Sequence, residues 1–134
     1  MNRSRTAVTR LLLGAVAGAT LAGCSLLGDP VQRQWEDRDQ LPSCGAVQLD
    51  QTQRLESVGG DAIACLEAAR SSGAGGELVL THLTTEGDPI IEYRRVTPAG
   101  TTEVYTDATK DKFGDGTWQY GSCARPTSAM DGAC

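Results

Sequence analysis

Residues 77–96 read ELVLTHLTTEGDPIIEYRRV, and this stretch decides the fold that the sequence predicts. Glu77–Thr85 reads as a strand, with Leu78 and Leu80 on one face and Val79 and Leu83 on the other. Glu86–Pro89 has the composition of a tight turn, and Ile90–Val96 reads as the returning strand. The stretch therefore predicts an antiparallel hairpin.

Further strands are predicted on both sides of this hairpin. Pro98–Gly100 reads as a second tight turn and Thr102–Thr106 as a third strand. Trp118–Tyr120 predicts a short last strand, and Ala46–Leu49 a short strand before the hairpin. Strands joined by such short turns are typical of an antiparallel meander.

A helix is predicted over DAIACLEAARSSG, residues 61–73, with Asp61 as its N-cap and Gly73 as its C-cap. The apolar residues that share one face at helical spacing are Ala62, Cys65, Leu66 and Ala69. Cys65 is therefore expected to point into the core. The predicted fold class is α+β, a small antiparallel meander sheet of three to five strands with one helix packed on one face.

The N-terminal residues have the pattern of a secretory signal peptide. Three arginines and no acidic residue precede Leu11–Gly23, which is uncharged. A basic segment before an apolar run of roughly 7–15 residues is what such peptides show. The alternative is a transmembrane helix, but spanning a bilayer takes about 20 apolar residues.

The residues Leu21-Ala22-Gly23-Cys24 resemble the bacterial lipoprotein box. The resemblance implies cleavage between Gly23 and Cys24 and a lipid on the Cys24 thiol. Two or three acyl chains hold a protein stably on a bilayer, whereas one holds it marginally. The alternative is ordinary secretory cleavage that leaves Cys24 as a stray thiol.

The expected organisation has three parts. Residues 1–23 are a lipoprotein signal peptide, residues 24–43 a lipidated N-terminus with a flexible tether, and residues 44–134 a single small disulfide-stapled domain. The tether is inferred because the residues after Cys24 include two prolines and no apolar period. A short helix around Trp35 is the alternative.

The five cysteines support export. An odd number in an exported chain needs an explanation, and lipid on Cys24 leaves an even number for disulfides. The disulfide candidates are Cys44, Cys65, Cys123 and Cys134. Four cysteines can pair in three ways, and the sequence does not choose among them.

Charge restricts the partners. Without residues 1–23 the chain has 9 basic and 17 acidic residues, a formal charge of −8. So acidic a domain is repelled by nucleic acid, which we exclude as a partner. The expected partners are the lipid bilayer, through acylated Cys24, and an unknown envelope ligand or protein. The expected location is the extracytoplasmic face of the cell membrane, and no cofactor or metal is expected.

Two motifs carry a further resemblance. TTEGDPI at 84–90 and DATKDKFG at 107–114 together resemble a small domain of unknown function found in secreted and lipid-anchored proteins of Gram-positive bacteria. The resemblance covers about residues 75–123, and Lys110 stands where that family has arginine. It implies fold and compartment, and no activity.

The acidic residues of these motifs have two interpretations; they are Glu86, Asp88, Asp107 and Asp111. As structural residues, Asp88 caps its turn and Asp107 binds nearby amides, while Phe113 fills the core and Gly114 takes a left-handed conformation. As functional residues, the carboxylates converge at one end of the sheet. There they bind calcium or form an acid/base pair.

These observations favour a membrane-anchored envelope lipoprotein that acts as a binding or interaction module and not as an enzyme. The alternatives are a small envelope enzyme that uses the clustered carboxylates, or a calcium-binding adhesive domain. Arg94 and Arg95 are expected to pair with Glu92, Glu103 or the aspartates across strands. His82, which shares a strand face with Leu78 and Leu80, is interpreted as a packing or surface residue.

Overall fold

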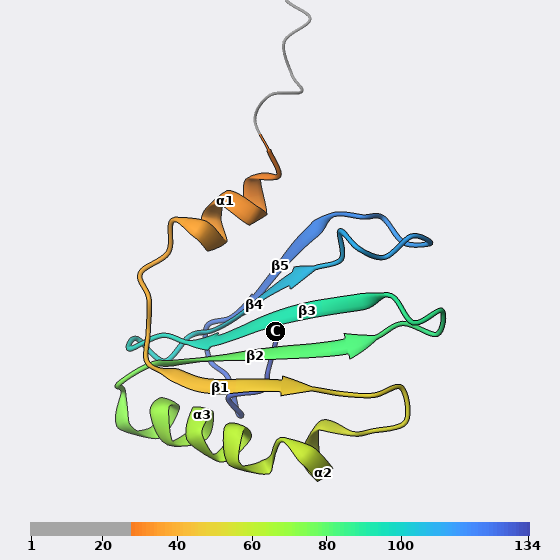
Figure 1. The fold of residues 1–134 in the computed structure, drawn as a ribbon. Coiled ribbons are helices and arrows are strands. Elements are labelled where there is room, and N and C mark those ends of the chain that lie inside the picture. Colours follow the sequence, from red (N-terminus) through yellow and green to blue (C-terminus); the bar gives the residue numbers. More distant parts are fainter. Residues whose placement is uncertain (1–27) are drawn as a thin grey trace, which may run out of the picture.

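The structure, a computed structural model, describes residues 28–134, which form one five-stranded sheet with helices on both sides (Figure 1). The predictions for Gly23 and Cys24 lie outside the described residues. In chain order the elements are α1 (Pro30–Glu36), β1 (Ser43–Gln48), α2 (Leu55–Val58), α3 (Gly60–Ser72), β2 (Gly76–Leu83), β3 (Pro89–Val96), β4 (Thr102–Asp107) and β5 (Trp118–Cys123).

The strands lie in the order β1-β2-β3-β4-β5. The predicted hairpin is present, with Thr81 opposite Ile91 and Gly76 opposite Val96. From β2 to β5 all pairs are antiparallel, but β1 pairs with β2 in parallel. A parallel pair needs a crossover, and the α2–α3 segment supplies it. The α+β class is confirmed, whereas a purely antiparallel meander with a single helix is not what the chain forms.

Helix α3 differs from the prediction at its N-terminus but ends at the predicted residue. Gly59 is its N-cap residue, and Asp61 lies inside the first turn without capping it. The carboxylate of Asp61 is still well placed there, because negative charge is favourable near a helix N-terminus. Gly73 ends the helix in a left-handed conformation, with φ of 69°, as predicted.

The hydrophobic core lies between α3 and the sheet. Leu66 of α3 packs with Leu78 of β2, Val96 of β3 and Ala129 of the C-terminal segment, and all four are buried. The alternation along β2 produces this layer, because Leu78 and Leu80 share the face that α3 covers. This core is small. The opposite face of the sheet is packed by aromatic side chains and by helix α1.

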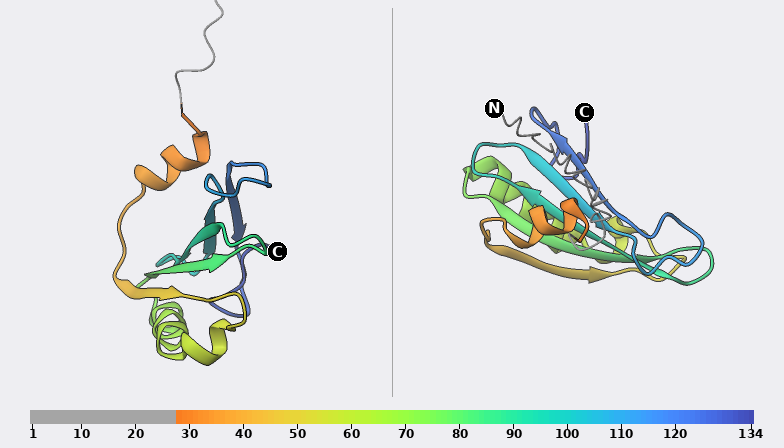
Figure 2. Two further views of the ribbon diagram at one scale, coloured as in Figure 1. Left: turned by 45° about the vertical axis from the view of Figure 1, so that its right-hand side comes forward. Right: turned by 90° about the horizontal axis from the view of Figure 1, so that it is seen from above.

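Helix α1 covers part of that opposite face (Figure 2). Its Trp35 ring stacks on Tyr93 of β3, with centroids 4.2 Å apart. Asp29 accepts from the amide of Val31 at the start of the helix and from the amide of Trp118 in β5. The expectation of a flexible tether is therefore corrected from Asp29 onward, and the alternative of a short helix around Trp35 holds.

Two disulfides close the fold. Cys44 of β1 bonds to Cys65 of α3, and Cys123 at the end of β5 bonds to Cys134. Cys44 packs against the core, but Cys65 is exposed, so the expectation that Cys65 points into the core is wrong. Together they use all four candidate cysteines and select one of the three pairings.

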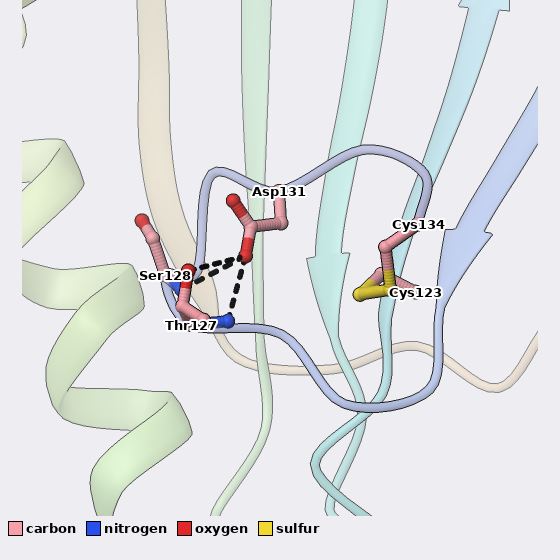
Figure 3. Close-up of a disulfide and its surroundings, with 5 residues drawn as sticks. All are labelled: Cys123, Thr127, Ser128, Asp131 and Cys134. Carbon is pink, nitrogen blue, oxygen red and sulfur yellow. Dashed lines mark hydrogen bonds between the residues drawn. A yellow bond between two sulfur atoms is a disulfide. The ribbon is translucent and has the colours of Figure 1, made fainter.

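The C-terminal segment folds back over the α3 side of the sheet in a loop that one carboxylate organises (Figure 3). Asp131 accepts from the amides of Thr127 and Ser128, at 2.7 and 3.0 Å. These backbone donors hold the pKa of Asp131 below its ordinary value. The ordered loop brings Ala129 to the core and Cys134 to Cys123. None of the helices within residues 28–134 has the length and apolar character that crossing a membrane requires.

Candidate functional site

A row of charged side chains crosses three strands on the α1 side of the sheet. Glu77 of β2 is opposite Arg95 of β3, which is opposite Glu103 of β4. Arg95 donates from Nε to Glu77 at 2.9 Å and from Nη1 to Glu103 at 2.6 Å. Its Nη2 donates to the carbonyl of Asp39 at 2.7 Å. Residue Arg95 is only 7% exposed, so its charge is compensated inside the protein.

A second arginine joins this row from the segment after α1. Arg38 donates from Nε and Nη2 to the two carboxylate oxygens of Glu77, a bidentate pair. Its guanidinium carbon lies 3.1 Å from the centroid of the Trp35 ring, which is a cation–π contact. The network thus joins the chain after α1 to strand β2, 39 residues further on.

An aromatic row runs next to the charged row. Tyr93, Tyr105 and Tyr120 are opposite one another on β3, β4 and β5. Trp118 stacks parallel to Tyr93, with centroids 5.7 Å apart. The Tyr120 hydroxyl donates to Glu103 at 3.1 Å, which links the two rows. Burial raises the pKa values of Tyr93, Tyr105 and Tyr120, so these phenols are neutral hydrogen-bonding groups at physiological pH.

A cleft of about 580 Å³ opens over these rows, between the segment from α1 to β1 and strands β3 and β4. Its size falls in the range of small-molecule sites. The base contains Arg95, Glu103 and Tyr105, and the wall comes from α1 and the residues after it. The full lining is Gln34, Asp37, Arg38, Asp39, Leu41, Arg95, Thr97, Pro98, Glu103 and Tyr105. Charges of both signs, a tyrosine and the apolar side chains of Leu41 and Pro98 therefore face one space.

The two motifs of the sequence analysis meet at the end of the sheet. Asp88, after the β2–β3 turn, accepts from the backbone amide of Lys112 at 3.1 Å and from its ammonium at 2.7 Å. These bonds lower the pKa of Asp88 and raise that of Lys112. Gly87 supplies the left-handed residue of the turn, with φ of 90°, and Pro89 begins β3. Asp88, however, binds the neighbouring loop and does not cap its own turn.

The other motif aspartates bind the loop from 108 to 117. Asp107 accepts from the amide and hydroxyl of Thr109, at 2.9 and 2.6 Å, as predicted. Asp111 accepts from the amides of Phe113 and Gly114, each at 3.0 Å. A side chain on Gly114 would collide with the Asp111 carboxylate, so any other residue there would have to displace that carboxylate from the amides it binds.

Two details of the structural interpretation are wrong. Phe113 does not fill the core, because 77% of it is exposed. Gly114 is not the left-handed residue of this loop, since that conformation belongs to Gly116. Both errors concern the tip of the loop, where turn residues fix the backbone but apolar character does not predict burial.

The carboxylates of Glu86, Asp88, Asp107 and Asp111 do not form a common site. Three of them bind separate backbone amides, and Glu86 is exposed in the turn. Among the described residues no three acidic, histidine or cysteine side chains gather in a way that could hold a metal ion. The expectation of a calcium-binding cluster is therefore corrected, whereas the acid/base pair stays a prediction.

Most residues around the cleft were not singled out from the sequence. The pairing of Arg95 with Glu103 was expected, and so was that of Arg94 with Glu92, which are 2.6 Å apart. The other residues at the base of the cleft could have been found from the alternation of side chains along strands β3 and β4. Arg95 shares its strand face with Tyr93, and Glu103 with Tyr105, so one face had to combine charges and aromatic rings. His82 lies beside Leu80 on the other face, partly exposed and 3.9 Å from Glu92.

No protein-family model matches the chain, and no curated protein or solved structure matches it significantly. The resemblance of the two motifs to a Gram-positive secreted domain stays a prediction.

Proposed function

We propose that this protein is a cell-envelope lipoprotein, anchored to the outer face of the cell membrane by acyl chains on Cys24, and that it works as a binding module. The lipoprotein box at residues 21–24 and the basic leader before it support the anchor. The two disulfides support an oxidising compartment. They account for four of the five cysteines, and Cys24 is the remaining one.

The observation that carries the binding role is the cleft beside α1. Its base is rigid, because Arg95 is held by three partners from separate parts of the chain. A pre-organised polar surface loses little conformational entropy when a ligand binds. The lining offers hydrogen-bond donors and acceptors of both charges around Tyr105. We therefore assign the cleft to a small polar ligand or to a short piece of an envelope polymer.

Binding is favoured over catalysis by the ion pairs of the cleft. Arg38 and Arg95, which line it, are both paired with Glu77, and Arg95 is also paired with Glu103. Burial raises the pKa of Tyr105, so its phenol is a neutral hydrogen-bonding group.

The anchor is tested by growing cells that express the full chain with a clickable fatty acid. Label on the wild-type protein and none on Cys24→Ala are expected. A Cys24→Ala variant that is labelled as strongly as the wild type would refute the anchor. The unreduced protein should at the same time show no free thiol at Cys44, Cys65, Cys123 and Cys134 by mass spectrometry.

The cleft is tested with muropeptides, soluble wall fragments that carry hydroxyls, amides and carboxylates. We expect amide chemical-shift changes at residues that line the cleft, and their loss in Gln34→Trp, which fills the cleft from α1. Glu36→Trp is the matched control, because Glu36 is exposed on the same helix and does not line the cleft. Shift changes that survive in Gln34→Trp would place the binding elsewhere.

A further inference from the structure

Phe113 stands out among the described residues because it is the most exposed large apolar side chain. It is 77% exposed, compared with 47% for Val58 and 40% for Tyr120. It lies in the loop of residues 108–117, which joins β4 to β5 and which we call the Phe113 loop. One exposed apolar residue is ordinary on a soluble surface. The structure around Phe113 nevertheless indicates what its side chain could contact.

The backbone on both sides of Phe113 is fixed. Asp111 accepts from the amides of Phe113 and Gly114, and Asp88 accepts from the amide of Lys112. Three consecutive amides are thus bound by carboxylates of the protein. The ring therefore projects from an ordered loop, and no local collapse brings it back to the core.

The same loop ends beside the start of the folded domain. Trp118, the first residue of β5, donates its amide to Asp29 at 3.0 Å. Asp29 follows Cys24 by five residues, and five residues reach at most about 18 Å when fully extended. Figure 1 shows the start of α1 above β5, with the Phe113 loop at one end of that strand. An acyl anchor on Cys24 would therefore hold this loop close to the bilayer surface.

The formal charge of the Phe113 loop is less negative than that of the rest of the molecule, so an anionic headgroup layer repels the loop less. The Phe113 loop has two lysines and two aspartates, a formal charge of zero, whereas the chain from Cys24 carries −8. Lys112 directly precedes Phe113 in the chain and Lys110 lies two residues earlier, and the Lys112 ammonium, at the surface, pairs with Asp88. The Asp111 carboxylate faces the amides of its own loop. Lysine beside an aromatic ring is a common arrangement at the bilayer interface.

We infer that the Phe113 loop docks on the lipid bilayer, with the Phe113 ring inserted at the headgroup level and Lys110 at the anionic headgroups. The inference rests on the proposed acyl anchor. A single ring binds a bilayer weakly, but a short tether raises its effective concentration at the surface. Docking would fix the orientation of the domain and leave the cleft beside α1 facing away from the lipid on the side of the Thr97–Gly100 turn.

The test uses the full chain in bacterial cells, with the photo-crosslinking residue p-benzoylphenylalanine in place of Phe113. The control carries the same residue in place of Val58, which is exposed on α2. After irradiation, mass spectrometry counts phospholipid adducts and the acyl mass on Cys24 in the same sample. We expect about tenfold more lipid adduct at position 113 than at position 58.

The outcomes separate the two proposals. Acylated protein with no more lipid adduct at position 113 than at position 58 overturns the docking inference and leaves the anchor intact. A crosslink from position 113 to another protein, with no lipid adduct, also overturns it in favour of a protein partner. A chain without acyl mass overturns the anchor, and with it the docking. Phe113→Ser should melt at the wild-type temperature, which shows that the side chain is not needed for folding.

Discussion

Asp88 binds both the backbone amide and the ammonium of Lys112, and so one carboxylate joins the β2–β3 turn to the loop before β5. The two residues belong to the two motifs that stand out in the sequence, 24 positions apart. The structure thus gives those motifs a shared task, which is to hold two neighbouring loops in one arrangement.

Asp88→Asn should destabilise the protein more than Lys112→Ala does. The asparagine side chain would lose the ion pair and bind the amide at position 112 less strongly, whereas the alanine variant keeps that amide bond to Asp88. A fall in melting temperature of roughly 3–6 °C is expected for Asp88→Asn. Thermal melts followed by circular dichroism measure both variants. Equal melting temperatures for the two variants would contradict the expectation that Asp88→Asn is the less stable.

The same link should weaken in acid. The pKa of Asp88 is lowered in the folded protein, so its contribution to stability is present above the unfolded pKa of about 3.9 and is lost as the pH falls through the folded value. Melts between pH 2 and pH 7 should therefore show less acid sensitivity in Asp88→Asn than in the wild type. A parallel decline in both proteins would show that Asp88 does not contribute.

Asp111→Ala should lower the melting temperature, while Asp111→Asn should stay close to the wild type. An asparagine oxygen can still accept from the amides of Phe113 and Gly114, and alanine leaves both donors without this partner. Millimolar Ca²⁺ should shift neither the wild type nor the variants. A calcium-dependent rise in the wild-type melting temperature would instead support the metal site that the described residues do not form.

Trp35→Ala should detach α1 from the sheet. Loss of the stack on Tyr93 and of the contact with Arg38 is expected to cost about 2–4 kcal/mol in the free energy of unfolding and to weaken the near-ultraviolet circular dichroism. Glu36→Ala, an exposed change on the same helix, is the control and should be nearly silent. Denaturant titration of both variants decides whether α1 belongs to the folded unit.

Thr102→Val should stabilise the protein. The Thr102 hydroxyl is buried between Val96 and Cys123 in the sheet and, among the described residues, has no hydrogen-bond partner. A methyl group of similar size removes that desolvation penalty, for a gain of about 1 kcal/mol. Thr106→Val, at a partly exposed position of the same strand face, controls for β propensity. A loss of stability in Thr102→Val would mean that the hydroxyl has a partner.

Replacing either cysteine pair by alanine should cost about 3 kcal/mol, with the larger loss for Cys44 and Cys65. That bridge closes a separation of 21 residues, against 11 for Cys123 and Cys134, and a longer loop loses more entropy in the unfolded chain. Urea denaturation of the two double variants gives the comparison. Disulfide mapping of the wild type should find these two pairings and no other.

The hairpin at residues 77–96 could be predicted because strand alternation and turn composition agree there. The parallel pairing of β1 could not, since direction depends on how the α2–α3 segment crosses the sheet. Helix α1 was only an alternative, because two apolar residues, Val31 and Trp35, are too few to establish a helical period.

The cleft was also hidden from the sequence. It depends on contacts such as that of Arg38 with Glu77, which lie far apart along the chain. Asx-type turns were easier to predict, because Asp107 acts on its own neighbours. Phe113 was misplaced because hydrophobicity alone does not tell a core residue from one that a fixed loop turns outward.

Asp29 has a mechanical consequence. One of its oxygens caps α1, and the other binds the amide of Trp118 on the edge strand β5. Tension on the preceding residues would therefore reach the sheet through this side chain before it could peel Trp35 from Tyr93. A domain pulled from its N-terminal end would therefore resist first at strand β5, which is the last strand in the chain.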